Sequence, residues 1–469
     1  MTDLALAYQA AWRTAELIRE AKLSPVEVVQ NALDRIADVN PALNAFCFVW
    51  DDSALAEARL AADAVARGDA LRPLHGVPIA VKDTTPTAGR RTTLGSYTHE
   101  HWVPIDDAAI VTALRRSGAI IVGKTTTPEF AHSSVTDSPL WGPTRNPWDL
   151  TRTPGGSSGG SGAAVASGCV PLAEGSDMGG SVRIPAAWSG VVGLKPSLGR
   201  IPMDVLPGLF DNISHHGPLA RCVDDARLFL VATQGPDDAD ILSIPGPLDF
   251  SAPIDGEIGG MRLGLSVDLG CWEVDPVIGD AVEHAAETLR RAGASVEHVN
   301  PAFTAADDEL WVKLWGVFMA AYFGHFTDRF ADRMDPNVLA LIEYGRSFSA
   351  VDYKRLEIER TDTWHRLRGA MRDVDVLLCP TMATAPVPAE RLNQAHPPKF
   401  DDGRVRSNDM TGVFNLTSPC PAMSVPIGLH PEGTPIGLQI VGHRWDEPTV
   451  LRVGRAVELN LAPIGHPPI

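Results

Sequence analysis

The sequence predicts an α/β fold with a largely parallel or mixed sheet. Short apolar segments typical of buried strands alternate with segments whose apolar residues recur at helical spacing. Residues 76–81 form one such strand, which ends at Lys82, and residues 119–122 form another, with a helical pattern at 105–116 between them. The chain has 469 residues, of which 44% are hydrophobic and 21% charged, so it can bury a large core.

The first sixty residues are expected to be helical. Ser24 precedes Pro25 and stands three residues before Glu27, a pattern typical of a capped helix start. A second helix is expected from Ala54 to Ala66, ending near Gly68.

In the second half of the chain, residues 309–325 show the spacing of a helix and residues 374–378 that of a strand. Residues 422–429 and 435–441 read as two paired strands around a turn at 431–434. No internal repeat is evident.

Composition excludes several classes of function. A net charge of −18, with no run of Lys or Arg, argues against nucleic-acid binding. No stretch approaches 18 consecutive apolar residues, so no membrane span is expected, and the acidic start is unlike a signal peptide. The six cysteines lack metal or redox spacing, and we expect buried thiols, no metal, no cofactor and a cytoplasmic location.

Residues 118–125 fit the phosphate-loop pattern GxxxxGK[ST] letter for letter. That motif wraps a phosphate with the amides of its four middle residues at the start of a helix. Here those residues are Ala-Ile-Ile-Val, which favour a buried strand. We therefore expect Lys124 to lie on a strand rather than in a nucleotide site.

Two segments rich in glycine and serine carry the candidate chemistry. Residues 155–159 fit the nucleophile pattern GxSxG around Ser157, although the residues before them are loop-like rather than a strand. Residues 175–185 place Gly179 and Gly180 just before Ser181, where a tight turn can aim backbone N–H groups at a developing oxyanion. The two serines stand 24 residues apart, downstream of the strand that ends at Lys82.

Taken together, these segments resemble the amidase signature family, from about Leu74 to Pro202 and from about Asp373 to Glu458. The matching strings include Gly76-Val77-Pro78-Ile79-Ala80-Val81-Lys82-Asp83, Pro154-Gly155-Gly156-Ser157-Ser158-Gly159-Gly160-Ser161, residues 175–185, and Gly437-Leu438-Gln439-Ile440-Val441-Gly442.

The resemblance implies a large central mixed sheet flanked on both sides by helices, in one domain over residues 1–469. Within it we expect N-terminal helices at 1–70, the family core at 71–230 and 373–469, and a variable, substrate-determining segment at 240–370.

The resemblance also implies a catalytic triad, with Lys82 as the base, Ser157 as a bridging serine after a cis peptide bond from Gly156, and Ser181 as the nucleophile. Lysine accepts a proton only when it is neutral, and burial at the end of an apolar strand favours that form. The implied oxyanion donors are the backbone N–H groups of Met178, Gly179, Gly180 and Ser181.

The expected reaction is hydrolysis of a small carboxylic amide through an acyl-enzyme, with esters or carbamates open to the same chemistry. A histidine-dependent esterase with Ser157 as nucleophile stays open, with His215, His216, His325, His365 or His443 as its base. So does a non-catalytic subunit of an amide-transfer complex, although Thr127-Pro128-Glu129-Phe130 departs from the Met-Asp-Glu-Phe of the tRNA-amidating subunit.

For the neighbours of the triad we expect structural roles: Asp83 and Asp177 accept backbone bonds, and Arg183 pairs with a carboxylate. Where the family commonly has an Asp, this chain has Ser214. An aromatic stripe at helical spacing either packs in the core or lines an apolar funnel for aryl or alkyl amides, and a homodimer is left open. The stripe consists of Trp311, Trp315, Phe318 and Tyr322.

Overall fold

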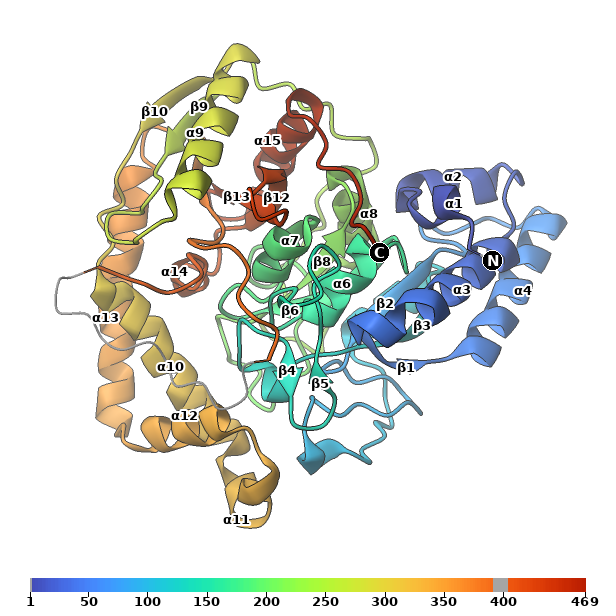
Figure 1. Ribbon diagram of the computed structural model, residues 1–469, viewed down its shortest axis with the longest axis horizontal. Helices are drawn as coiled ribbons and strands as arrows, with labels where there is room; N and C mark the ends of the chain where they lie inside the picture. The colour runs from blue at the N-terminus through green and yellow to red at the C-terminus, as the bar shows by residue number, and fades with distance from the viewer. Residues whose placement is uncertain (1, 391–403) are drawn as a thin grey trace.

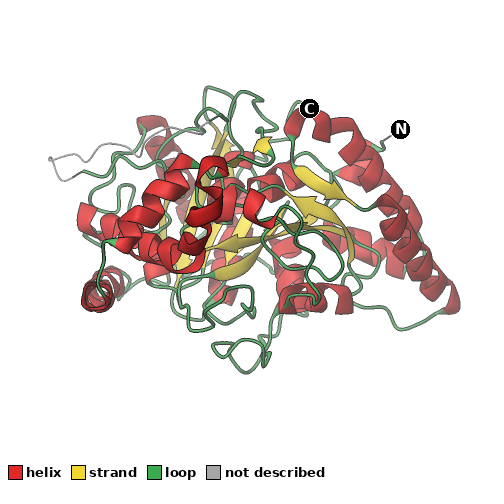
Figure 2. Cartoon of the chain, turned by 90° about the horizontal axis from the view of Figure 1, so that it is seen from below, coloured by secondary structure: helices red, strands yellow, loops and turns green. Residues whose placement is uncertain are grey.

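The computed structural model of the protein describes residues 2–390 and 404–469. One mixed sheet of 11 strands runs through the molecule, and helices cover both of its sides (Figures 1 and 2). This architecture confirms the predicted fold class. Residues 391–403 of the expected 373–469 core lie outside the described part of the chain.

The strands of the large sheet follow the order β1-β3-β2-β6-β8-β7-β12-β13-β11-β9-β10. A separate pair is formed by β4 (Asp137–Ser138) and β5 (Gly142–Pro143). The strands of the large sheet are β1 (Phe46–Val49), β2 (Pro78–Lys82), β3 (Ile120–Thr125), β6 (Leu172–Asp177), β7 (Val192–Lys195), β8 (His215–Ala220), β9 (Arg262–Leu265), β10 (Ser295–His298), β11 (Val376–Pro380), β12 (Ala422–Leu429) and β13 (Pro435–Gly442).

The α-helices range from single turns to 21 residues in α13. They are α1 (Leu4–Ala7), α2 (Ala11–Arg19), α3 (Pro25–Leu43), α4 (Asp51–Arg67), α5 (Ala109–Arg116), α6 (Gly159–Ala166), α7 (Arg183–Ser189), α8 (Val223–Thr233), α9 (Pro276–Arg291), α10 (Ala305–Phe323), α11 (Thr327–Phe330), α12 (Pro336–Arg346), α13 (Ala350–Ala370), α14 (Val413–Leu416) and α15 (Glu447–Asn460). Four short 3₁₀ helices are described at Tyr97–His99, Glu129–Ala131, Gly324–Phe326 and Ala331–Arg333.

Strand β2 lies between β3 and β6 and runs parallel to both. Its side chains alternate between two cores. Ile79 and Val81 belong to a core cluster that also includes residues of α5, α8 and α15, whereas Ala80 belongs to one that includes residues of α3, α4 and α6. A strand covered on both faces has no polar side, which explains its uninterrupted apolar sequence. Lys82 stands at the end of this strand and is fully buried.

The N-terminal region confirms the predicted helices, with one correction. The Ser24 hydroxyl accepts a hydrogen bond from the Val26 N–H at 3.2 Å, and α4 ends at Gly68 in a left-handed conformation. The expectation that the first sixty residues are all helical is wrong at β1, which pairs antiparallel with β3 at the edge of the sheet. Four residues, Phe-Cys-Phe-Val, are too few to show a period in the sequence.

The last six residues of the pattern GxxxxGK[ST] form β3, as its strand-forming residues predict. All six residues of β3 are buried, and Lys124 donates to the carbonyl oxygens of Thr85 and Lys82. Its amine therefore supports the turn that follows Lys82 and does not line a nucleotide site.

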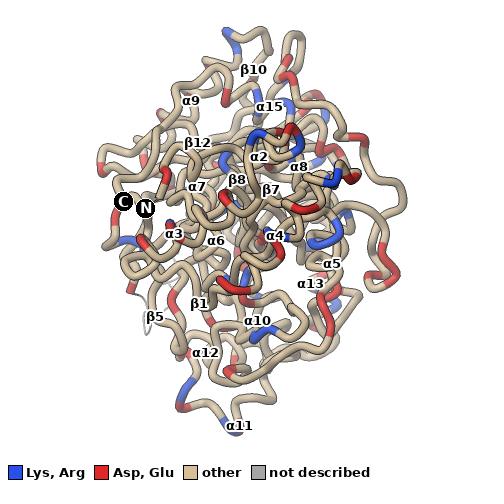
Figure 3. The backbone as a smooth tube through the Cα atoms, turned by 90° about the vertical axis from the view of Figure 1, so that its right-hand side faces the viewer, with Lys and Arg blue, Asp and Glu red and all other residues tan. Residues whose placement is uncertain are grey.

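The helix predicted at 309–325 is α10, and it begins earlier, at a capping box formed by Thr304 and Asp307. Strands β12 and β13 pair antiparallel, as predicted. No helix in the described ranges is long and apolar enough to cross a membrane. Along the tube in Figure 3, Lys and Arg are interspersed with Asp and Glu rather than gathered into a stripe.

Helices α10 and α12 cross in close contact, which sets the position of the aromatic stripe. Both helices have a buried glycine at the crossing, Gly316 and Gly345. A Cβ atom added to Gly345 would lie 1.9 Å from the carbonyl oxygen of Gly316, so the two backbones touch. Any larger residue at position 345 must push the helices apart.

We expect Gly345→Ala to lower the free energy of unfolding by about 1–3 kcal/mol, because backbone atoms cannot yield as a flexible side chain can. Gly369→Ala is the matched control, since Gly369 lies on α13 with nothing within 4 Å of an added Cβ. That control should stabilise the helix by about 0.5–1 kcal/mol. Thermal and urea unfolding of both variants checks this, and an undisturbed Gly345→Ala protein would contradict it.

Candidate active site

The amine of Lys82 lies at the centre of the site. Its Nζ donates to the Ser157 hydroxyl at 2.7 Å and to the Ser176 hydroxyl at 3.0 Å. Burial lowers the pKa of Lys82 to about 7, against the opposing effect of the carboxylates of Glu174 and Asp177. The amine is therefore neutral in a large fraction of molecules at neutral pH, and only the neutral form can accept a proton.

Ser157 lies in the turn that enters α6, and the peptide bond from Gly156 is cis, as the resemblance implied. No described strand runs directly into this turn, so it is not the strand-turn-helix elbow that GxSxG would require. The next residue, Ser158, donates its N–H to the carbonyl oxygen of Ser181 at 3.2 Å. That bond joins the two serine-bearing segments predicted from the sequence.

The glycines before Ser181 are required by close contacts. A Cβ on Gly179 would lie 2.1 Å from the ring of Trp311, and one on Gly180 would lie 1.9 Å from the hydroxyl of Thr411. Gly180 also has a φ of +121°, a region that side chains rarely allow. In addition, the Gly180 N–H donates to Oδ1 of Asp177 at 2.8 Å, so this implied oxyanion donor is already engaged.

A buried ion pair between Asp177 and Arg183 stabilises the segment around Ser181. Arg183 is fully buried and binds the Asp177 carboxylate with two nitrogens, at 2.8 and 2.9 Å. Burial favours the protonated acid, but the Arg183 guanidinium outweighs it and holds the pKa of Asp177 below its usual range. The remaining guanidinium N–H groups donate to Thr411, Gln439 and Asn415, so all five donors are satisfied.

These contacts confirm the structural roles expected for the neighbouring charges. Arg183 pairs with a carboxylate, and Asp177 accepts N–H groups of its own loop. Asp83 likewise accepts the N–H of Thr93 at 3.0 Å.

The aromatic stripe forms a ladder on α10, and one end of it reaches the site. Trp311, Trp315, Phe318 and Tyr322 contact one another in sequence, with ring centroids 4.3–6.0 Å apart. Trp315 is buried in a cluster with α12, which fits core packing. Trp311 is half-buried and donates its indole N–H to the carbonyl oxygen of Met178 at 2.9 Å. Within the stripe, Trp315 therefore packs in the core, whereas Trp311 contacts the loop before Ser181.

The hydroxyl of Ser157 contacts a lysine amine, whereas the five histidines make other contacts or are exposed. They are His215, bonded to the carbonyls of Asp177 and Ser418; His216, bonded to Glu174; His443, bonded to the carbonyl of Val374; and His325 and His365, which are exposed. This arrangement does not favour the histidine-dependent esterase.

Several contributors were not recognised from the sequence. Ser176, the second hydroxyl on Lys82, lies in a quoted motif but carries no mark that separates it from other serines. Thr411 and Asn415 are more than 200 residues from Arg183 in the chain, and only the folded sheet brings them together.

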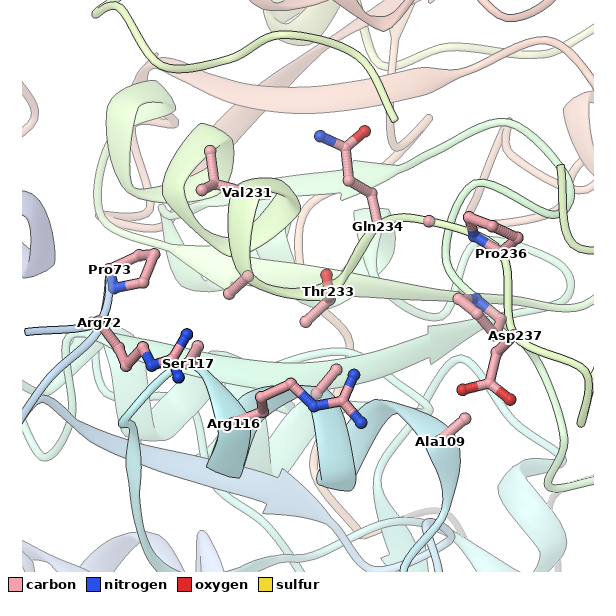
Figure 4. Close-up of a pocket in the computed structure, with 14 residues that line it drawn as sticks. Arg72, Pro73, Ala109, Arg116, Ser117, Val231, Thr233, Gln234, Pro236 and Asp237 are labelled. Carbon is pink, nitrogen blue, oxygen red and sulfur yellow. The ribbon is translucent and has the colours of Figure 1, made fainter. Parts of the chain in front are cut away.

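A cavity of about 210 Å³ lies elsewhere, between α5 and the end of α8 (Figure 4). Its lining includes Arg116, Val231 and Thr233, and none of the triad candidates. We assign it no catalytic part.

Comparison with known proteins finds matches over nearly the whole chain. The sequence profile of the family described as Amidase matches residues 27–451. The chain is 35% identical to the acylamidase of Rhodococcus erythropolis over 464 residues, which is 98% of this chain and 96% of the relative. It is 36% identical to a glutamyl-tRNA(Gln) amidotransferase subunit of Acidothermus cellulolyticus, over 96% of this chain and 94% of that one.

The fold gives the same result. The crystal structure of a bacterial aryl acylamidase of the amidase signature family superposes with a TM-score of 0.91, at 28% identity, over 97% of this chain and 96% of that one. The chain belongs to the amidase family of amidase signature enzymes and is an amide-hydrolysing enzyme.

Proposed function

We propose that the protein hydrolyses a small carboxylic amide through an acyl-enzyme on Ser181, with Ser157 as the proton bridge and Lys82 as the base. The observation that supports this most directly is the 2.7 Å hydrogen bond between the buried amine of Lys82 and the hydroxyl of Ser157. A serine hydroxyl becomes a useful nucleophile only when a neighbour takes its proton.

In the proposed cycle, neutral Lys82 takes the proton of Ser157 as Ser157 takes that of Ser181. The Ser181 oxygen attacks the carbonyl carbon, and a tetrahedral oxyanion forms. The relay then reverses: the proton passes to the amide nitrogen, the C–N bond breaks and the amine leaves. Water, deprotonated by the same route, releases the acid from the ester.

The oxyanion would be held by backbone N–H groups of the loop after β6. Gly180 is bonded to Asp177 in the structure, so the proposed donors are the N–H groups of Met178, Gly179 and Ser181. The Asp177–Arg183 pair would orient this loop without touching the substrate. Loss of a single oxyanion donor typically costs about 10²–10³-fold in rate.

For the substrate class we propose acylamides with an aryl or alkyl amine part. This proposal is supported by Trp311, which packs against Gly179 and is bonded to Met178, because its aromatic ring would then lie beside the carbonyl that Ser181 attacks. The names of two relatives, an acylamidase and an aryl acylamidase, agree with this class.

A second candidate is the amide-releasing component of a tRNA-dependent amidotransferase, because relatives named as glutamyl-tRNA(Gln) amidotransferase subunits are up to 36% identical over nearly the whole chain. The two candidates separate on the purified chain. Hydrolysis of an anilide without any partner supports the stand-alone amidase, whereas activity only with glutamine and partner subunits supports the second.

An active-site fluorophosphonate should label Ser181, and Ser181→Ala should abolish both labelling and amide hydrolysis. Ser189→Ala is the control, since Ser189 is a buried serine on α7 that donates to the carbonyl of Pro154. It should keep both properties. Peptide mapping by mass spectrometry identifies the labelled residue, and a label on Ser157 would contradict the proposed assignment.

The proposed base predicts the pH dependence. Because Lys82 must be neutral and its pKa is about 7, kcat/KM should fall about tenfold per pH unit below that value. Lys82→Met should lose about 10²–10⁴-fold in rate.

Lys195→Met is the matched control for this test. Burial also lowers the pKa of Lys195 to about 7, but its amine donates to backbone carbonyls, including those of Ser418 and Cys420. The acid limb of its pH–rate profile should stay in place. Loss of the acid limb in the Lys195 variant would show that Lys195, and not Lys82, is the base, and would contradict the proposal.

We expect kcat/KM for an anilide to exceed that for malonamide by at least about tenfold. Contact of the substrate's aromatic ring with Trp311 should stabilise the transition state by more than about 1.4 kcal/mol. Initial rates on the two substrates under identical conditions measure this. A strong preference for the short aliphatic amide would refute the substrate class while leaving the triad untouched.

A further inference from the structure

Two fully buried ionisable side chains lie next to the segment that carries Lys82, and the proposed mechanism does not use them. Glu174 is on β6 and His216 is on β8, and both are 0% exposed. His216 pairs in register with Ser176, two residues from Glu174, so the two side chains share one face of the sheet. Nδ1 of His216 lies 2.8 Å from Oε1 of Glu174.

The same carboxylate contacts the segment that carries the base. Oε2 of Glu174 accepts the backbone N–H of Lys82 at 2.9 Å, and both of its oxygens lie within 3.2 Å of the Thr85 hydroxyl. Glu174 therefore holds the residues on both sides of the turn that follows Lys82.

The contacts of His216 indicate its tautomer. Nδ1 donates to Glu174, whereas Nε2 is buried without a partner among the described residues. A proton on Nε2 would be a buried donor with nothing to bond, which costs more than an unused lone pair. We therefore assign a proton to Nδ1, which donates to the Glu174 carboxylate.

Resting on the proposed function, we infer that Glu174, held by His216, is a positioning residue that sets the working pH range of Lys82. The carboxylate fixes the end of β2 through the N–H of Lys82, and its negative charge favours the protonated form of the Lys82 amine.

The electrostatics follow from this geometry. Burial alone lowers the pKa of the Lys82 amine, and Glu174 is the largest opposing influence, followed by Asp177. Two other charged side chains near the end of β2 are Asp83 and Lys124, which interact with each other. Burial favours the protonated form of Glu174, but the hydrogen bond from His216 and that from the Lys82 N–H outweigh it and lower its pKa. Glu174 therefore stays negatively charged across the working pH range.

The test is the pH dependence of Ser181 labelling by a fluorophosphonate, which needs no substrate, in the full-length chain. Glu174→Gln keeps the size of the side chain and an oxygen acceptor for the Lys82 N–H but removes the charge. Because Glu174 is the largest influence that raises the pKa of Lys82, its loss should move the midpoint of the acid limb about 1 unit to lower pH. A loss of the plateau rate with an unmoved midpoint is the signature of a purely structural role and overturns the inference.

Glu447→Gln is the matched control. Glu447 is also 0% exposed and accepts a backbone N–H, that of Ser197 at 2.8 Å, but it pairs with Arg200 and does not contact β2. Its midpoint should equal that of the wild type. A midpoint that moves equally in the Glu447 variant shows a general effect of lost buried charge and overturns the inference.

If Glu174→Gln does not fold, two substitutions of His216 carry the test. His216→Asn keeps a donor to Glu174 near the Nδ1 position and should keep the wild-type midpoint of the acid limb. His216→Leu removes that donor and should move the midpoint to lower pH. Equal midpoints in these two variants overturn the inference. Wild-type labelling that does not depend on Lys82 is a different failure, because it overturns the proposed function itself.

Discussion

The amine of Lys82 is withheld from water at the end of a strand that is covered on both faces, and the rest of the site is arranged around that fact. An ammonium group there would lose its hydration, so burial shifts the equilibrium toward the neutral amine, which can accept a proton. The hydroxyls of Ser157 and Ser176 satisfy it without adding charge. The parallel neighbours β3 and β6 make this burial possible, because they leave β2 no open edge.

Two buried carboxylates near Lys82, those of Asp177 and Glu174, bind different partners. Asp177 is fully committed to Arg183 and to the loop N–H groups, so it braces the segment before Ser181. Glu174 is committed to the backbone of Lys82 and to His216. The two carboxylates on one strand thus serve different loops. A site built this way has little freedom to rearrange, since removing either acid would leave a buried partner unsatisfied.

Much of the fold could be predicted from the sequence, because β2, β3 and the β12–β13 pair consist mostly of apolar residues. The triad segments were recognisable from the glycine and serine strings around Ser157. What could not be predicted depends on contacts distant in the chain: β1 is too short to show a period, and Asn415 reaches Arg183 only through the folded sheet. For the same reason the commitment of the Gly180 N–H to Asp177 could not be seen in the motif.

The indole of Trp311 is bonded to the carbonyl of Met178, and Gly179 has no room for a side chain beneath the ring. In the proposed mechanism, substrate selectivity and rate are therefore linked at this position. A substitution of Trp311 made to change the proposed substrate range would also disturb the peptide unit between Met178 and Gly179, whose N–H is a proposed oxyanion donor, so slower turnover is expected with it.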